Sequence, residues 1–235
     1  MTLVVCVYVP NGIILAADSR TTLEKANKLR DAQGKEIVVT EKIVLSDAFY
    51  KVIKLSKVDV GIACFDSAYI DNNPIEFHIR SFEETEVKKD DDVENVATKF
   101  KAYFTKEFPQ IPVGTVIAGF KIENEKSIPY VLGYHTVKDK DPKRWNIDDK
   151  GKVVFGIARG GDAIIVNRLI DPNFVPAFQA MTIQDAIDYA IYLIGTTIDT
   201  LKFEPRYPTV GGPIDVLLLE PNKVGFIQRK EYHGE

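Results

Sequence analysis

The chain has 235 residues, of which 45% are hydrophobic and 27% charged, and its formal net charge is −4. This composition supplies enough apolar material for a core and excludes a disordered chain. A mildly acidic chain is also a poor candidate for nucleic-acid binding through a broad basic face. Because no repeat, low-complexity tract or long linker divides the chain, we expect a single domain over residues 1–235.

Cysteine and histidine usage argues against disulfide and metal chemistry. Cys6 and Cys64 each lie inside an apolar run, as expected for buried, reduced thiols in a cytoplasmic protein. The histidines are scattered without metal-ligand spacing, and the HExxH, CxxC, Walker A and GxGxxG motifs are absent from the sequence. We therefore expect neither a metal nor a cofactor.

The apolar N-terminus resembles an export signal in composition but lacks its other features. No Lys or Arg precedes Arg20, and Pro10-Asn11-Gly12 interrupts the apolar run. No stretch reaches the length of a membrane span. We expect a cytoplasmic protein that does not enter the membrane.

The same segment predicts a β-hairpin. Residues 2–9 and 13–17 are apolar throughout, and the Pro-Asn-Gly between them is typical of a turn. Continuously apolar strands indicate a sheet that is covered on both faces. A turn at this place brings Thr2 opposite residues 18–20, which form either a polar cluster at the end of a buried strand or simply a solvated strand end.

The middle of the chain predicts strands around two helices. Residues 21–36 are polar and indicate a loop or a short exposed helix, followed by a strand or hairpin over 37–45. We interpret 21–50 as an insertion that forms an exposed hairpin, a flap over the site or a contact within a ring. Strands are expected over 51–55 and 58–64.

A first helix is expected over about 66–84, with Pro74 at its start or at a restart. Asp90-Asp91-Asp92 precedes an amphipathic helix that begins at Val93, and we expect this triplet to cap the helix rather than to bind a cation.

The second half repeats the order of strands followed by helices. Strands are expected over 113–121, 129–136 and 153–157, a short helix up to Ile170, and a longer helix opened by a capping box at Thr182 and Asp185. The final strands are expected over 214–219 and 223–228. Helices with one apolar stripe and strands that are apolar on both faces predict an α+β fold, a four-layer α-β-β-α sandwich of two antiparallel sheets.

This layout, with a strand that starts directly at Thr2, resembles the N-terminal-nucleophile hydrolases and more narrowly the proteasome β-subunit family. The matching segments are 14–20, 51–55, 115–120 and 211–216. The ADSRT sequence at 17–21 and the VGGPID sequence at 210–215 most resemble the bacterial proteasome-like group called Anbu.

The resemblance implies a catalytic threonine. An N-terminal threonine supplies nucleophile and base in one residue, because its free α-amino group has a pKa of about 8 and can take the hydroxyl proton. Thr2 would be this residue after removal of Met1, which is the usual fate of Met before Thr. Asp18 matches the family aspartate, which orients a lysine whose ammonium lowers nearby pKa values. Lys51 begins the next core strand and fits the family lysine, whereas Lys35 is nearer by spacing but lies in a polar stretch.

Several positions depart from the family pattern. Residues 158–161 lack the serine that the family carries before its third helix, and Tyr207 and Val210 stand where a supporting Asp and Ser are expected. The glycine whose amide forms the oxyanion hole falls at 63–65, where other residues can still offer the amide in a pocket of different shape.

The sequence therefore leaves three functions open. The first is a threonine-type peptidase without a cofactor, acting on peptides or unfolded proteins inside a homo-oligomeric ring or related assembly, with an ATPase as a candidate partner. The second is a non-catalytic assembly subunit, which the altered surroundings of the nucleophile favour. The third is an amidase or acyltransferase that acts on a small or dedicated substrate.

Overall fold

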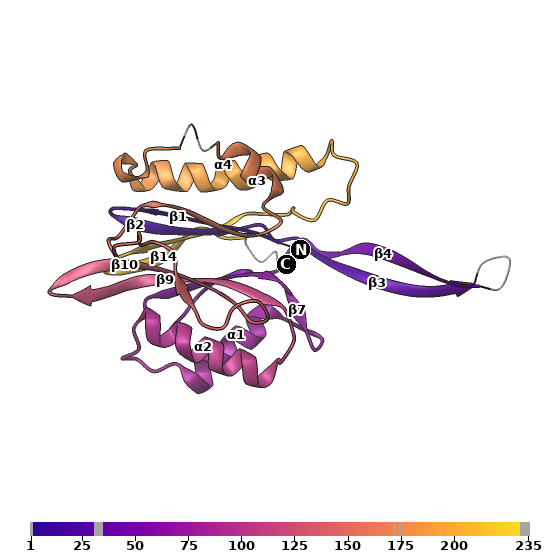
Figure 1. Ribbon diagram of the computed structural model, residues 1–235, viewed down its shortest axis with the longest axis horizontal. Coiled ribbons are helices and arrows are strands. Elements are labelled where there is room, and N and C mark those ends of the chain that lie inside the picture. The colour runs from indigo at the N-terminus through magenta and orange to yellow at the C-terminus, as the bar shows by residue number, and fades with distance from the viewer. Residues whose placement is uncertain (1, 31–34, 172, 174, 231–235) are drawn as a thin grey trace, which may run out of the picture.

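The computed structural model describes residues 2–30, 35–171, 173 and 175–230, so Met1, and with it the expected removal of this residue, lies outside the described part. Two five-stranded antiparallel sheets lie face to face (Figure 1). The first contains, in spatial order, β12 (Gly156–Gly161), β1 (Leu3–Val9), β2 (Gly12–Ala17), β13 (Asp215–Glu220) and β14 (Lys223–Gln228). The second contains β11 (Lys143–Arg144), β10 (Lys126–His135), β9 (Val113–Glu123), β6 (Val60–Asp66) and β5 (Val52–Lys54).

Helices cover the outer face of each sheet. Figure 1 shows α3 (Ile164–Leu169) and α4 (Ile183–Leu201) over the first sheet, and α1 (Ile75–Glu86) and α2 (Val93–Glu107) over the second. The expected mixed α+β class with antiparallel sheets is confirmed. No helix in the described residues is long and apolar enough to cross a membrane.

Strand β1 explains why its sequence is apolar at every position. Leu3 and Val5 belong to the cluster of side chains under α4. Val4 and Cys6 point the other way, into the layer between the two sheets. The predicted hairpin is confirmed with its register, because Val4 pairs with Ala17 and each later pair keeps the same sum of residue numbers.

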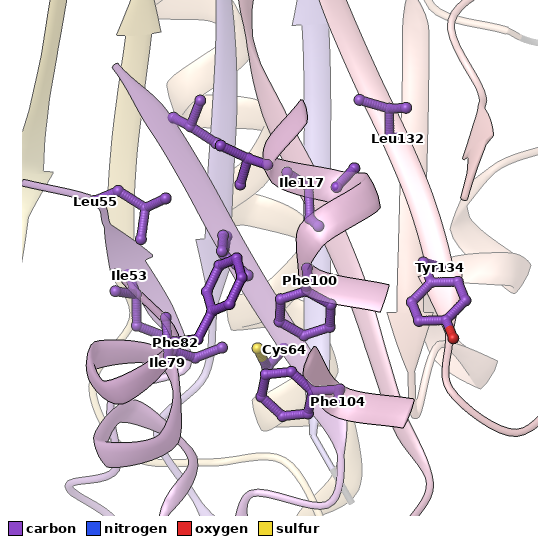
Figure 2. Close-up of a cluster of buried hydrophobic side chains, with 14 of the residues drawn as sticks. Ile53, Leu55, Cys64, Ile79, Phe82, Phe100, Phe104, Ile117, Leu132 and Tyr134 are labelled. Carbon is purple, nitrogen blue, oxygen red and sulfur yellow. The ribbon is translucent and has the colours of Figure 1, made fainter. Parts of the chain in front are cut away.

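A third apolar cluster joins the second sheet to α1 and α2. Figure 2 shows Phe82 of α1 and Phe100 and Phe104 of α2 gathered over Cys64 and Ile117 of the sheet. The rings of Phe100 and Phe104 stack with their centroids 4.1 Å apart. This packing fixes β6 and, through β5, the segment that carries Lys51.

Both helix caps expected from the sequence are present. The Asp92 side chain accepts a hydrogen bond from the Asn95 amide at 2.9 Å, so the acidic triplet ends in an N-cap. Thr182 and Asp185 form the reciprocal capping box at the start of α4.

Among the described residues no group of three or more potential metal ligands is found.

Three expected boundaries are wrong. Residues 21–30 form strand β3 (Thr21–Arg30) instead of a loop or helix. The first helix begins at Ile75 and not near residue 66, where the short strands β7 (Tyr69–Ile70) and β8 (Asn73–Pro74) precede it; the expectation that Pro74 marks its start is confirmed, because Pro74 is the N-cap with extended backbone. The strand expected over 153–157 lies further along the chain as β12, which pairs with β1.

Strand β3 and β4 (Glu36–Ser46) form a separate two-stranded sheet, which agrees with the exposed hairpin expected for the insertion. This arm, residues 21–46 without the undescribed 31–34, extends away from the two sheets (Figure 1). Its direction does not fit a flap folded over the body. The arm follows the end of β2, beside the start of β1 and the candidate site.

Candidate active site

Thr2 lies at the start of β1 and is fully buried. Its carbonyl oxygen accepts a hydrogen bond from the amide of Asp162 at 2.7 Å, one step beyond the pairing of Leu3 with Gly161. Gly161 has φ of +80°, and a Cβ at this position would lie 1.7 Å from the Thr2 carbonyl oxygen. Only glycine therefore lets β12 approach the nucleophile candidate this closely.

Asp18 directly follows β2 and is fully buried, with both carboxylate oxygens occupied. Its Oδ1 accepts from the Leu3 amide at 2.9 Å and from Lys51 Nζ at 3.0 Å. Its Oδ2 accepts from the amides of Arg20 at 3.1 Å and Gly211 at 3.0 Å. Four donors from four parts of the chain hold the carboxylate, so its position depends on the whole fold rather than on its own strand end. The alternative of a solvated strand end does not fit this burial.

Lys51 immediately precedes β5, and its side chain is fully buried. Its ammonium donates to Asp18 and to the carbonyl oxygen of Arg20. Burial lowers the pKa of Lys51, and the neighbouring Asp18 partly opposes that effect. Lys35, the other candidate, is exposed beside the start of β4, so the structure brings Lys51 and not Lys35 to the aspartate.

Three buried hydroxyl groups belong to residues adjacent in sequence to the groups that form or contact this ion pair. The side-chain oxygens of Thr2, Ser19 and Thr21 have no hydrogen-bond partner among the described residues. An unsatisfied buried hydroxyl costs about 1–3 kcal/mol, so such groups usually have a functional or a ligand-related reason. The Thr2 hydroxyl is thereby left without an internal partner that would compete for its proton or lone pairs.

A second buried carboxylate, Asp162, lies on the other side of Thr2. Its Oδ2 accepts from Arg206 Nη1 at 2.5 Å and from the Thr209 hydroxyl. Burial opposes ionisation of this carboxyl group, but the hydrogen bonds from Arg206 and Thr209 hold its pKa below the ordinary value. The sequence analysis missed this residue, and the signal that could have found it is an Asp that directly follows the Gly160-Gly161 pair as the strand ends.

Of the amides expected to form an oxyanion hole, that of Cys64 is used inside the sheet, because it donates to the Lys51 carbonyl oxygen at 2.8 Å. A cavity of about 190 Å³ opens beside the site, lined by residues 21–23 of β3 and 66–69. A larger cavity of about 660 Å³ has Gly161, Phe65, His135 and Trp145 in its wall. Residues next to Thr2 in the fold therefore line a cavity, whereas Thr2 itself is buried behind them.

No family model and no curated protein matches the sequence. The fold matches a solved structure of Anbu from Hyphomicrobium sp. strain MC1, in its Gly-1 mutant form, with a TM-score of 0.61 and 13% sequence identity. The match covers 97% of this chain and 87% of that chain. The match confirms the resemblance to the Anbu group at the level of the fold.

Proposed function

We propose that this protein is a threonine-type peptidase that uses Thr2, exposed by removal of Met1, to hydrolyse peptide bonds. The observation that carries the proposal is the buried ion pair of Asp18 and Lys51 directly beside Thr2, with Lys51 Nζ 3.0 Å from Asp18 Oδ1. A fully buried ion pair contributes little net stability, which makes a catalytic reason for it attractive. We further propose a single cytoplasmic domain with the four-layer α-β-β-α arrangement of this hydrolase class.

The reaction would follow the chemistry of an N-terminal nucleophile. The neutral α-amino group of Thr2 accepts the hydroxyl proton while Oγ1 forms a bond to the scissile carbonyl carbon. When the resulting oxyanion collapses, the C–N bond breaks and the α-ammonium returns the proton to the leaving amine. Water then attacks the ester, again with the α-amine as base, which releases the acid and restores the hydroxyl of Thr2.

Lys51 would supply positive charge to this chemistry. An ammonium ion near the Thr2 hydroxyl favours its alkoxide form and lowers the pKa of the α-amine, so that more of the amine is neutral near pH 7. Because burial lowers the pKa of Lys51 itself, the negative charge of Asp18 and the hydrogen bond that its carboxylate accepts from Lys51 have the role of keeping this lysine charged. The roles of Asp18 and Lys51 in the proposal are thus coupled.

An extended peptide is the substrate that the surroundings favour. The cavity between residues 21–23 and 66–69 begins directly after Arg20, whose carbonyl oxygen binds Lys51. Strand β3 forms one wall, so a peptide bound there could add backbone hydrogen bonds to a strand, a common mode of peptide recognition. The role of this cavity is part of the proposal.

The test uses chain produced with Thr2 as its first residue, checked by intact mass. A peptide α′,β′-epoxyketone reacts with the hydroxyl and the α-amine of one N-terminal threonine, so we expect a single adduct on Thr2. We also expect cleavage of unfolded-protein and peptide substrates that Thr2→Ala lacks. Unchanged turnover in Thr2→Ala would refute the proposal.

The same preparation separates the alternatives. A non-catalytic assembly subunit would form no adduct and cleave nothing, although its fold remained intact by circular dichroism. An amidase or acyltransferase would form the adduct but turn over small acyl amides instead of peptides. A chain that retains Met1 serves as the control, because its α-amine is not on Thr2.

We also propose that the arm binds a second copy of this chain. The pairing of Leu23 with Ile43 and of Leu29 with Ile37 places these residues on one face of the arm. The aliphatic residues of this face have 38–51% of their surface exposed, and Lys25, Asn27 and Glu41 lie between them on the same face; the aliphatic residues are Leu23, Leu29, Ile37, Val39 and Ile43. A two-stranded ribbon is marginal in water without a covering partner, and monomers rarely expose contiguous apolar patches on such elements.

The dimensions of the arm favour mutual coverage by two copies. Strands of about ten residues and two strands in width give each face about 300 Å². Two arms that exchange across a twofold axis would each cover one of their faces and an equal area of the partner, about 1,200 Å² in total, which reaches the lower limit of specific interfaces. A single arm on an unrelated partner would cover about half of that area.

Adjacent valines on opposite faces give a matched test of this interface. Val39 lies on the aliphatic face and Val38, 62% exposed, on the other. We expect light scattering to show an oligomer for the wild type and Val38→Lys and a smaller species for Val39→Lys. A wild-type monomer, or equal behaviour of the two variants, would refute the proposal.

A further inference from the structure

Asp162 is the buried titratable group nearest to Thr2 that the proposed mechanism leaves without a role. It is 4% exposed, and its amide is bonded to the Thr2 carbonyl oxygen at 2.7 Å. This hydrogen bond joins backbone atoms, so it holds Asp162 beside Thr2 independently of the conformations of their side chains. This leaves the question of what the carboxylate itself binds.

The two oxygens of this carboxylate are used unequally. Oδ2 accepts from Arg206 and from Thr209, and Arg206 is itself held by Glu204 Oε2 at 2.6 Å. Oδ1 is buried and makes no hydrogen bond of full geometry with the described residues, although the Ile164 amide also acts on this carboxylate and Arg206 Nη2 is likewise unpartnered. A buried carboxylate oxygen without a donor is rare in folded proteins and indicates a ligand or a group that is added or exposed later.

The α-amino group of Thr2 is a donor that changes when Met1 is removed. In the unprocessed chain this nitrogen is a neutral amide with one hydrogen. After processing it becomes an ammonium with three, separated by only the Cα and carbonyl carbons from the oxygen that Asp162 already binds. Removal of Met1 thus creates, at the nitrogen of Thr2, additional hydrogen-bond donors for Oδ1.

We infer that Asp162 is a positioning residue for the catalytic base: Oδ1 accepts a hydrogen bond from the α-amino group of processed Thr2. The inference rests on the proposed function for its meaning, but it concerns only the contact between Asp162 and the amine. Arg206 and Thr209 hold the carboxylate in place, and they lie in the same segment as Tyr207 and Val210, where the resembled family carries supporting residues of its own. Asp162, which directly follows β12, would then have the supporting role that those family residues have near the nucleophile.

This contact gives the α-amine two opposing charged neighbours. Lys51 disfavours protonation of the amine, whereas a carboxylate favours it and raises its pKa. Removal of the carboxylate charge must therefore lower the pKa of the amine. An opposite charge within hydrogen-bond reach shifts a pKa by one unit or more, so we expect Asp162→Asn to lower the pKa of the Thr2 amine by about one unit.

The experiment titrates the amine directly and does not depend on catalysis. Processed protein is labelled with ¹³C-threonine, the Thr2 signal is assigned by its absence from Thr2→Ser, and its ¹³Cα shift is followed from pH 5 to 10. The variants are Asp162→Asn and, as the matched control, Thr209→Val, which removes a hydrogen bond from the same carboxylate but keeps its charge. We expect the amine pKa to fall in Asp162→Asn and to stay at the wild-type value in Thr209→Val.

An amine pKa in Asp162→Asn equal to that of the wild type overturns the inference, whatever happens to thermal stability. If Asp162→Asn does not fold, Asp162→Ser removes the same charge with a smaller side chain and receives the same titration. Failure of wild-type Thr2 to react with the epoxyketone would instead refute the peptidase proposal. In that case the titration still decides whether Asp162 binds the amine, so the two failures are distinguishable.

Discussion

Replacement of Asp18 by asparagine is the sharpest test of the buried ion pair. In Asp18→Asn the Lys51 ammonium stays in a fully buried position without its carboxylate partner. Breaking a buried pair by removing one partner costs about 3–5 kcal/mol, because the remaining charge is uncompensated. Asn keeps a similar shape, so the loss would come from charge and hydrogen bonding rather than from a cavity.

The pH dependence of this loss identifies its cause. Burial already holds the pKa of Lys51 below its ordinary value of 10.5, and without Asp18 the pKa falls further. Between the folded and unfolded pKa values of this lysine the unfolded chain binds more protons, so stability rises with pH across that window. The deficit of Asp18→Asn relative to the wild type is therefore largest below the folded pKa of Lys51 in the variant, and it shrinks as the pH rises towards the folded pKa of Lys51 in the wild type, which itself lies below 10.5.

Urea unfolding at pH 7 and pH 9.5, followed by circular dichroism, measures this deficit. The control is Asp47→Asn, which removes the carboxylate that Arg20 binds at 2.7 and 2.8 Å in a partly exposed pair. We expect it to cost about 1 kcal/mol at both pH values. A loss below 1 kcal/mol for Asp18→Asn at pH 7, or a loss that does not shrink at pH 9.5, would contradict the reasoning.

Three further predictions concern other parts of the molecule. Gly161→Ala places a Cβ against the Thr2 carbonyl oxygen at a positive φ, so we expect a loss of about 3 kcal/mol or more in urea unfolding and no epoxyketone adduct; a stable, reactive variant would contradict the close approach of β12. Thr182→Ala removes the capping box of α4 and is expected to cost about 1 kcal/mol without changing adduct formation, and a variant as stable as wild type would contradict it. Burial raises the pKa of the Cys64 thiol to about 12 and also raises that of Cys6, so iodoacetamide at pH 8 should label neither in folded protein and both in urea; rapid labelling of native protein would show that the sheets do not enclose them.

The sequence predicted best the elements whose pattern extends over many residues. Strand β1 and its turn were identified because every residue is apolar and the turn chemistry is local. Strand β3 was missed because its residues, largely polar, face solvent on both sides, which leaves no alternation to detect. The alternation of apolar and polar residues that predicts a strand is present only where one face of the strand is buried.

The candidate site was predicted where its residues flank regular strands. The hairpin register placed Thr2 opposite residues 18–20, and the resemblance to the proteasome β-subunit family selected Thr2, Asp18 and Lys51 as candidates. Asp162 and Arg206 could not be paired from sequence, because they are 44 positions apart and Arg206 lies outside the helices and strands. Only the folded chain shows that a carboxylate lies beside Thr2.

Arg20 contacts both the candidate site and the base of the arm. Its carbonyl oxygen binds Lys51 and its amide binds Asp18, while its guanidinium group binds Asp47 just beyond the end of β4. Any displacement of the arm is therefore transmitted by one residue to both members of the buried ion pair. Under the proposal that a second copy binds the arm, a copy that immobilised the arm would also restrict the position of Lys51.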